Sequence, residues 1–127
     1  MIRRPTPVFE LYRWHRDALA GRAPAIHDGE PHCGWFKTRA VKGGPWMAAR
    51  IWCERDIDPE TGELTGPEEL HCDVDGMFRD PARAWLSLAH NPISRAEYDA
   101  LLHRRNLIPA MQEPHKAIDL SAAAMRP

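Results

Sequence analysis

Indole rings and cationic side chains alternate along one short segment of the chain, residues 34–53. The alternation places these side chains on one face of two predicted strands, because successive side chains of a strand point to opposite faces. Indoles stack on nucleobases, and Lys and Arg contact phosphates or stack themselves. The sequence therefore predicts a nucleic-acid-binding face with these members: Trp35, Lys37, Arg39, Lys42, Trp46, Arg50 and Trp52.

The two strands are expected to form a hairpin that turns at residues 43–44, a pair of glycines. Favoured two-residue hairpin turns need positive φ angles, which glycine adopts at no steric cost. This turn would place Trp35 opposite Trp52 and Lys37 opposite Arg50. Like charges that face each other across strands cost up to about 1 kcal/mol, so an anionic group is expected to compensate them.

The opposite face of the hairpin is apolar and carries Phe36, Met47 and Ile51. We expect this face to lie on the core and the indole face to remain open. The alternative is a hairpin buried on both sides, in which a helix covers the indoles while Lys and Arg reach past its edge into water.

The formal net charge of −1 hides a strong segregation along the chain. Residues 1–55 hold ten Lys and Arg against five Asp and Glu, whereas residues 56–80 hold one Arg against nine acids. A dipolar field of this kind favours oriented docking. The acidic segment could imitate phosphate charge and dock a basic groove, and the residues predicted for that alternative site are Asp56, Asp58, Glu60, Glu63, Asp73 and Asp75. The acidic segment could equally neutralise the basic hairpin within the fold.

The remaining patterns predict a single α+β domain over residues 1–127, with a small antiparallel sheet of three or four strands. An amphipathic helix is expected over 7–20, with Thr6 as its N-cap and His15 packed at the edge of the core. Alternation predicts a strand over 70–74 and a short return strand at 77–78. Asp80 and Ser94 are caps that open two helices, an αα-hairpin over about 81–105. Residues 1–6 and about 108–127 are expected to be weakly structured.

Catalysis and metal binding find little support in the sequence, and no cofactor is expected. The serines lack a strand–Ser–helix elbow, and no phosphate loop is present. The soft ligands are not spaced like a structural zinc site, and burial of the cysteines as small hydrophobic groups would explain them. The sequence leaves open whether these side chains ever bind metal: His32, Cys33, Cys53, His71 and Cys72.

The composition predicts a cytoplasmic protein. No apolar run approaches bilayer length, the first residues lack the apolar stretch of a signal peptide, and three cysteines agree with a reducing compartment. No membrane partner is therefore expected.

Three stretches carry a resemblance to a known group of proteins: residues 34–52, Asp58-Pro-Glu-Thr-Gly-Glu63 and Asn91-Pro-Ile-Ser-Arg-Ala-Glu-Tyr98. Over most of residues 10–105 the chain resembles small uncharacterised accessory proteins of tailed phages and prophages in proteobacteria. The chain departs from them after Trp46, where Met-Ala-Ala replaces their Val-Pro-Val. The resemblance implies a mobile-element accessory protein that handles nucleic acid or interferes with a host complex, and it implies no catalytic residue.

The sequence thus favours a non-enzymatic phage or mobile-element protein that binds nucleic acid through its Trp/Lys/Arg hairpin. The first alternative is a protein-binding, anti-CRISPR-like inhibitor of a host defence complex that uses the acidic 56–80 segment. A weaker alternative is a structural component of the virion or of its assembly. The partner is then nucleic acid or a host or phage nucleoprotein complex, and the oligomeric state is left open.

Overall fold

The computed structural model describes residues 3–107 and shows an α+β fold built on one antiparallel sheet. The predicted fold class is confirmed. The sheet has the order β1-β2-β3-β4, with β1 (Gly34–Thr38), β2 (Met47–Glu54), β3 (Glu69–Val74) and β4 (Met77–Arg79). The helices are α1 (Val8–Leu11), α2 (Arg13–Leu19), α3 (Pro81–Ala89) and α4 (Arg95–Leu107). The weakly structured tail predicted for 108–127 lies outside the described residues.

One face of the sheet carries the main core, as the apolar alternation predicts. Phe36 and Ile51 are completely buried there, against Trp14 of α2 and against Trp85 and Leu88 of α3. Met47 packs against the same cluster and is partly buried. We call this side of the sheet the core face and the other side the indole face.

The predicted pairing of β1 with β2 is wrong by two residues. Lys37 lies opposite Ala48, and Trp35 lies opposite Arg50. Lys37 and Arg50 are therefore not the cross-strand pair that the sequence predicts. The chain reverses through a turn in which the Gly44 N–H donates to the Val41 carbonyl at 2.9 Å, and residues 39–46 lie outside both strands. A shift by two leaves every side chain on its predicted face, which is why the assignment of the faces is correct.

The predicted helix over 7–20 is interrupted at Tyr12, whose φ of −103° and ψ of 15° separate α1 from α2. The interruption turns α1 away from the core, so that Val8 is 60% exposed. It also sends two aromatic neighbours to different sides of the sheet. Tyr12 stacks on Trp35 of the indole face, while Trp14 packs against Trp85 in the core.

Thr6 does not cap the first helix, because its side chain is engaged elsewhere. Its hydroxyl donates to Glu68 at 2.8 Å, and its backbone N–H donates to the same carboxylate at 2.9 Å. Arg55 also binds Glu68 at 2.8 Å. These bonds tie the N-terminal segment to the connection between β2 and β3.

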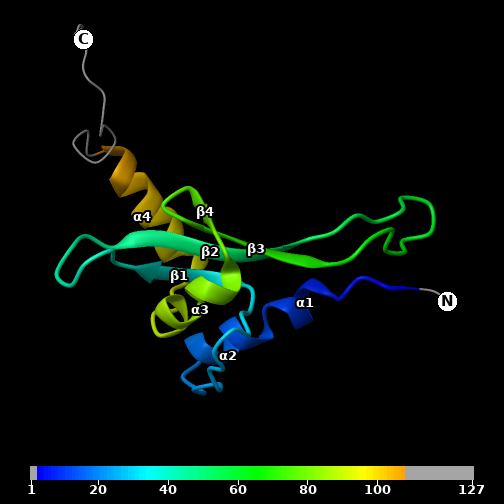
Figure 1. Cartoon of the computed structure of the whole chain (residues 1–127), viewed down its shortest axis with the longest axis horizontal. Helices are drawn as coiled ribbons and strands as arrows, with labels where there is room; N and C mark the ends of the chain where they lie inside the picture. Colours follow the sequence, from blue (N-terminus) through cyan, green and yellow to red (C-terminus); the bar gives the residue numbers. More distant parts are fainter. Residues whose placement is uncertain (1–2, 108–127) are drawn as a thin grey trace, which may run out of the picture.

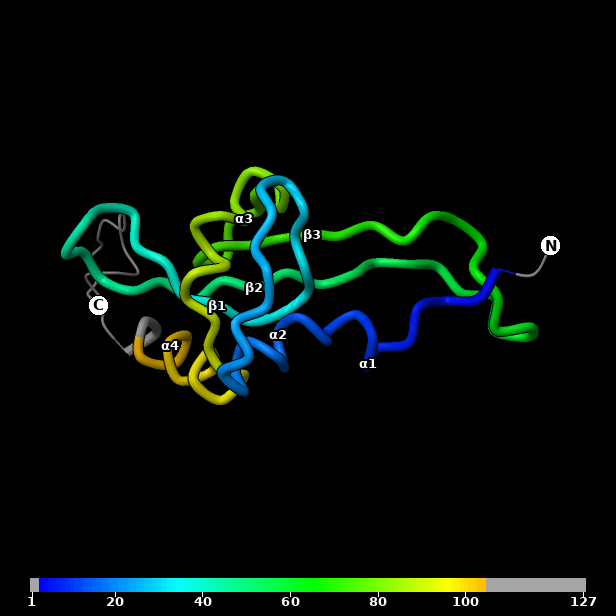
Figure 2. Tube along the Cα trace, turned by 90° about the horizontal axis from the view of Figure 1, so that it is seen from below, coloured from blue at the N-terminus to red at the C-terminus, as the bar shows by residue number. Residues whose placement is uncertain are grey.

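The two C-terminal helices begin at the predicted caps. The Asp80 carboxylate accepts the Ala82 N–H at 3.2 Å, and the Ser94 hydroxyl accepts the Glu97 N–H at 3.1 Å. The helices lie on opposite sides of the strands (Figure 2). α3 packs on the core face, and α4 covers part of the indole face with Tyr98.

The two long connections lie at opposite ends of the sheet (Figure 1). The basic β1–β2 connection, residues 39–46, is at one end, and the acidic connection 55–68 is at the other, beside the N-terminal segment. None of the helices in residues 3–107 combines the length and apolarity that crossing a membrane would require.

Candidate nucleic-acid interface

α4 divides the predicted binding face into two separate groups of residues. Tyr98 of α4 packs on Ala48 near the start of β2, and Glu97 lies 3.6 Å from Lys37. On one side of the helix is the tip group, which consists of Lys37, Arg39, Lys42 and Trp46. On the other side is the cleft group, which consists of Trp35, Arg50 and Trp52. The structure thus brings the seven predicted residues together in two places rather than along one ribbon.

The tip group lies beside a shallow hollow of about 420 Å³, and two of its cations stack on one indole. Lys37 Nζ lies 4.6 Å and Arg39 Cζ 4.1 Å from the centroid of a Trp46 ring. Lys37 is also paired with Glu97, while Arg39 and Lys42 are exposed. Part of the charge of this group is therefore compensated within the protein.

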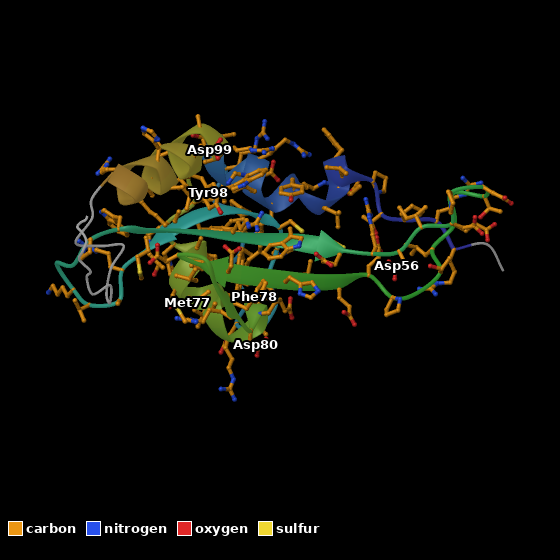
Figure 3. The ribbon with its side chains drawn as sticks, turned by 90° about the horizontal axis from the view of Figure 1, so that it is seen from above. Asp56, Met77, Phe78, Asp80, Tyr98 and Asp99 are labelled. Atoms are coloured by element: carbon orange, nitrogen blue, oxygen red, sulfur yellow. The ribbon has the colours of Figure 1, made fainter. Side chains whose placement is uncertain are left out.

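The cleft group lines a hollow of about 510 Å³ between α4, the α1–α2 junction and the sheet. Four aromatic side chains line it, and they are Tyr12, Trp35, Trp52 and Tyr98. The rings of Tyr12 and Trp35 are stacked, with centroids 5.0 Å apart and planes 23° apart. Figure 3 shows Tyr98 on the side of α4 that faces the strands. Burial raises the pKa of both tyrosines, so their phenols stay protonated at neutral pH.

Two guanidinium groups of the cleft stack on its indoles. Arg50 Cζ lies 4.3 Å from a Trp52 ring centroid, and Arg95 Cζ lies 5.5 Å from that of Trp35. The Arg50 Nε donates to Asp73 at 3.0 Å. Among the described residues neither Nη of Arg50 has a hydrogen-bond partner, so two nitrogens are left for a ligand.

The anionic group that was predicted to compensate the charge of Arg50 is a side chain of the protein itself, Asp73. Asp73 is buried beneath Arg50, with its side chain 9% exposed against 45% for Arg50. Burial lowers the pKa of the Arg50 guanidinium, but the hydrogen bond and the charge of Asp73 raise it more, so the pKa lies above its ordinary value. The ion pair fixes the position of the guanidinium at the floor of the cleft.

The aromatic floor continues beyond the cleft onto β3 and β4. Trp52 stacks on His71, with centroids 5.8 Å apart, and meets Phe78 at 6.4 Å. Phe78 is 75% exposed, and it shares the indole face because it lies opposite Asp73 in the β3–β4 pair. Figure 3 shows Phe78 on β4, away from α4. Three adjacent rings on the open half of the sheet form a row on which planar groups can stack.

Most of this site was not predicted from the sequence. The side chains left out of the prediction include Tyr12, His71, Phe78, Arg95, Tyr98 and Asp99. The α4 members and Leu102 follow the spacing i, i+3, i+4 and i+7 of one helix face, which is a signal in the sequence. Nothing local showed which face of the sheet this helix would cover.

His15 holds the cleft together from the edge of the sheet. Its Nε2 lies 3.0 Å from the Trp35 carbonyl and 2.8 Å from the Ile93 carbonyl, so a proton on Nε2 is donated to both. Burial lowers its pKa despite these bonds, which keeps the ring neutral. The predicted role of His15 at the edge of the core is confirmed. A Cβ at Gly34 would come within 2.6 Å of the His15 ring, so only glycine fits there.

The acidic residues predicted for the alternative site do not gather in one place. Asp56, Asp58, Glu60 and Glu63 share the 55–68 connection, and Figure 3 shows Asp56 far from Tyr98. Asp73 is buried beneath Arg50, and Asp75 lies in the β3–β4 turn with a φ of 55°. The acidic projection therefore consists of four of the six predicted residues.

The cysteines and histidines do not form a metal site in the part of the chain that the structure describes. No three His, Cys, Asp or Glu side chains gather there in a way that could hold an ion. Burial raises the pKa of Cys33 to about 12 and that of Cys72 to about 11. Both are therefore protonated thiols at neutral pH, the form that is a poor nucleophile and a poor ligand.

Another hollow, of about 540 Å³, lies between α3 and the end of the core face. Its lining includes one aromatic ring, Phe78, besides the aliphatic side chains of Val74 and Leu88, and none of the seven predicted residues lines it. We place the candidate site in the cleft on the indole face, where four aromatic side chains and two guanidinium groups occur together.

Comparison with models of known protein families, with curated proteins and with solved structures found no match for this chain. The function is therefore argued from the geometry of the cleft and of the acidic projection. The phage or prophage origin that the resemblance implies stays a prediction.

Proposed function

We propose that this protein binds single-stranded nucleic acid, without catalysing a reaction on it, at the cleft and at the adjoining row of Trp52, His71 and Phe78. One observation carries the proposal: four aromatic side chains and two guanidinium groups line a single hollow of about 510 Å³. Stacking of bases on aromatic rings supplies about 1–3 kcal/mol per base in single-strand-binding proteins. Guanidinium groups add hydrogen bonds to phosphates or base edges.

The arrangement favours a single strand over a duplex. Bases within a duplex stack on each other, so their faces are not free to lie on Trp52 or Phe78, whereas splayed bases of a single strand are. Phe78 offers most of its ring to solvent, and an exposed phenyl group beside an indole is otherwise an unfavourable surface. A base that covers both rings would remove this apolar area from water.

The charges of the cleft favour stacking over simple attraction of phosphates. Arg50 and Arg95 contribute two positive charges, and Asp73 and Asp99 contribute two negative charges. The site is therefore neutral overall. We expect affinity that falls with salt, as for any strand binder, but with the shallow slope of one or two phosphate contacts.

Fluorescence anisotropy with labelled oligonucleotides tests this proposal. We expect mixed-sequence 12-residue single strands of DNA or RNA to bind at low salt, and the matched duplexes to bind at least about tenfold more weakly because their base faces are occupied. Titration with the single strand should also quench the tryptophan fluorescence. An absence of binding to every probe at low salt, or tighter binding of the duplex, would refute the proposal.

We propose a second function, docking of the acidic projection on a basic partner protein, because this loop is firmly built. The Asp58 N–H donates to the Glu63 carbonyl at 2.8 Å, and the Thr65 N–H donates to the Asp56 carbonyl at 3.0 Å. The loop is also tied to the N-terminus, where the Leu64 N–H donates to the Arg3 carbonyl at 2.8 Å. Ordered carboxylates at the end of a sheet can imitate a row of phosphates.

Pull-down from a host lysate tests this second function. Reversing the charge of the projection with Lys at the four positions Asp56, Asp58, Glu60 and Glu63 should abolish capture of the partner. Lys at Asp28 and Glu30, two exposed acids of the loop before β1, serves as the control and should leave capture intact. Equal capture by both variants would exclude the projection.

A further inference from the structure

We infer that the cleft accepts a guanine base in preference to the other bases. This inference rests on the proposed function and concerns the same site. The inference is based on the side of the cleft that α4 forms. Two of its residues lie one helical turn apart: Arg95, whose guanidinium lies over the Trp35 ring, and Asp99.

These two side chains are neighbours that do not neutralise each other. Residues four apart on a helix have Cβ atoms about 5–6 Å apart and commonly form ion pairs. Here the Arg95 guanidinium lies over the Trp35 ring instead, at 5.5 Å. Among the described residues Asp99 makes no hydrogen bond or ion pair, although it lines the cleft. Figure 3 shows Asp99 further from the strands than Tyr98, at the outer part of the α4 wall.

Guanine is the base whose edge matches this order of groups. Its N7 and O6 are adjacent acceptors, which an Arg side chain binds in a bidentate manner. Next to O6 come N1–H and the exocyclic amine, two adjacent donors, and an ionised carboxylate is a pure acceptor with two oxygens. A guanine that enters the hollow beside these rings can therefore turn its acceptor pair to Arg95 and its donor pair to Asp99.

The other bases leave one of the two groups unmatched. Adenine and cytosine place an acceptor beside a single amine, and uracil and thymine flank one N–H with two carbonyl oxygens. Each of them would turn an acceptor toward a carboxylate oxygen, which is repulsive and leaves Asp99 without its hydrogen bonds. One good bidentate contact discriminates between bases by roughly tenfold or more.

The test measures how the full chain binds thymidine 12-mers that carry one central variable base. The probes are labelled strands with G, A, C or T at the centre, and two further strands with inosine or 7-deazaguanine there. We expect the G strand to bind about tenfold more tightly than the A, C and T strands. Inosine, which lacks the exocyclic amine, should lose most of this preference, and 7-deazaguanine, which lacks N7, should lose part of it.

The variant Asp99→Asn tests whether Asp99 selects the base or only supports binding of any strand. The amide keeps the shape of the side chain but replaces one acceptor by a donor, so the ratio of G-strand to T-strand affinity should fall to within about threefold. Glu97→Gln is the matched control on the same helix. Glu97 pairs with Lys37 of the tip group, so this variant should keep the full preference. Unfolding midpoints of both variants should equal that of the parent protein.

The outcomes distinguish the two proposals. If no strand binds at all, both the proposed function and the guanine inference are refuted. If the strands bind equally well, or if Asp99→Asn keeps the preference for G, the guanine inference alone is wrong and the single-strand-binding function stands.

Discussion

The tip group and the cleft group are made of the same residue types, yet only the cleft gathers several aromatic rings around one hollow. At the tip, Trp46 is covered by Lys37 and Arg39 from the same hairpin, and the hollow of about 420 Å³ beside it also has Ser87 of α3 and Asn91 in its lining. In the cleft, Trp52 lies beneath Arg50, and α4 and the α1–α2 junction supply further walls. The difference teaches that the aromatic rings of the cleft are brought together by α4 and the α1–α2 junction and not by the strands alone.

The ion pairs of the two groups differ in the same way. Lys37 is paired with Glu97, whose side chain is 50% exposed, at a distance of 3.6 Å. Arg50 is paired with the buried Asp73 at 3.0 Å and by a hydrogen bond. An exposed pair of this kind is worth little and can rearrange, whereas the buried carboxylate holds Arg50 in one position.

The largest difference is expected when one indole is removed from each group. Trp52→Ala should weaken binding of a single strand by about 10- to 100-fold, because one stacking platform of 1–3 kcal/mol is lost. Trp46→Ala should change the affinity by less than about threefold. Anisotropy titrations measure both variants, and Trp52→Phe serves as a control that keeps a stacking ring and most of the affinity. A larger loss for Trp46→Ala than for Trp52→Ala would reverse the comparison.

Removal of one cation from each group should affect stability unequally. Arg50→Gln leaves the buried Asp73 without its partner and should lower the free energy of unfolding by about 1–3 kcal/mol. Lys37→Gln leaves only the exposed Glu97 unpaired, at a cost within about 0.5 kcal/mol. Urea unfolding measures both values.

The double variant Arg50→Gln/Asp73→Asn is the control for this experiment. It removes the negative charge of Asp73, which Arg50→Gln leaves without a partner, and should recover part of the stability that Arg50→Gln loses. Equal stabilities of Arg50→Gln and Lys37→Gln would show that the buried pair does not fix the cleft.

Acid should loosen the cleft through His15, which has no counterpart at the tip. The folded protein lowers the pKa of His15 below its ordinary value of 6.5, so below pH 6.5 the unfolded chain binds more protons than the folded one. The contribution of His15 to the free energy of unfolding is therefore expected to be constant above this pH and to decline as the pH falls below it. Urea unfolding over a pH series checks this.

His15→Gln is the variant that tests the assignment to this side chain. It should reduce the decline below pH 6.5, and the remainder is expected from His32, whose pKa burial also lowers. An unchanged pH dependence in His15→Gln would show that this histidine does not couple protonation to stability.

The smallest effect is predicted for the exposed cations of the tip. If the strand occupies the cleft, Arg39→Gln and Lys42→Gln should leave the salt dependence of binding unchanged. If the strand reached the tip, each lost phosphate contact would lower the slope of log affinity against log salt by about 0.7. Titrations at several salt concentrations distinguish a strand that binds only in the cleft from one that extends to the tip.

Elements with strong local signals could be predicted from the sequence. Asp80 and Ser94 satisfy the first backbone N–H groups of α3 and α4, a requirement that the chain carries locally. The face of the sheet on which each side chain of β1 and β2 lies was also predictable. Side chains alternate between the faces, so a register shift by an even number of residues leaves each of them on the same face. The register itself was not, since the turn at Val41–Gly44 and the longer connection replaced the two-residue turn.

The cleft could not be predicted because its walls come from distant parts of the chain. Tyr12 reaches Trp35 only because the first helix is interrupted, and no glycine or proline marks that interruption. α4 reaches the indole face because residues 91–93 pair with the edge of β1, where the Ile93 N–H donates to the Trp35 carbonyl. Such long-range pairings depend on the assembled sheet and leave no periodic signal.

The five tryptophans allow one direct measurement of where a strand binds. Trp14 and Trp85 are buried in the core, Trp35 and Trp52 line the cleft, and Trp46 is at the tip. In a 15N-labelled protein, addition of a single-stranded 12-mer should shift the indole N–H resonances of Trp35 and Trp52 and leave those of the two core indoles and of Trp46 in place. A shift confined to Trp46, or no shift of either cleft indole at saturating oligonucleotide, would contradict binding in the cleft.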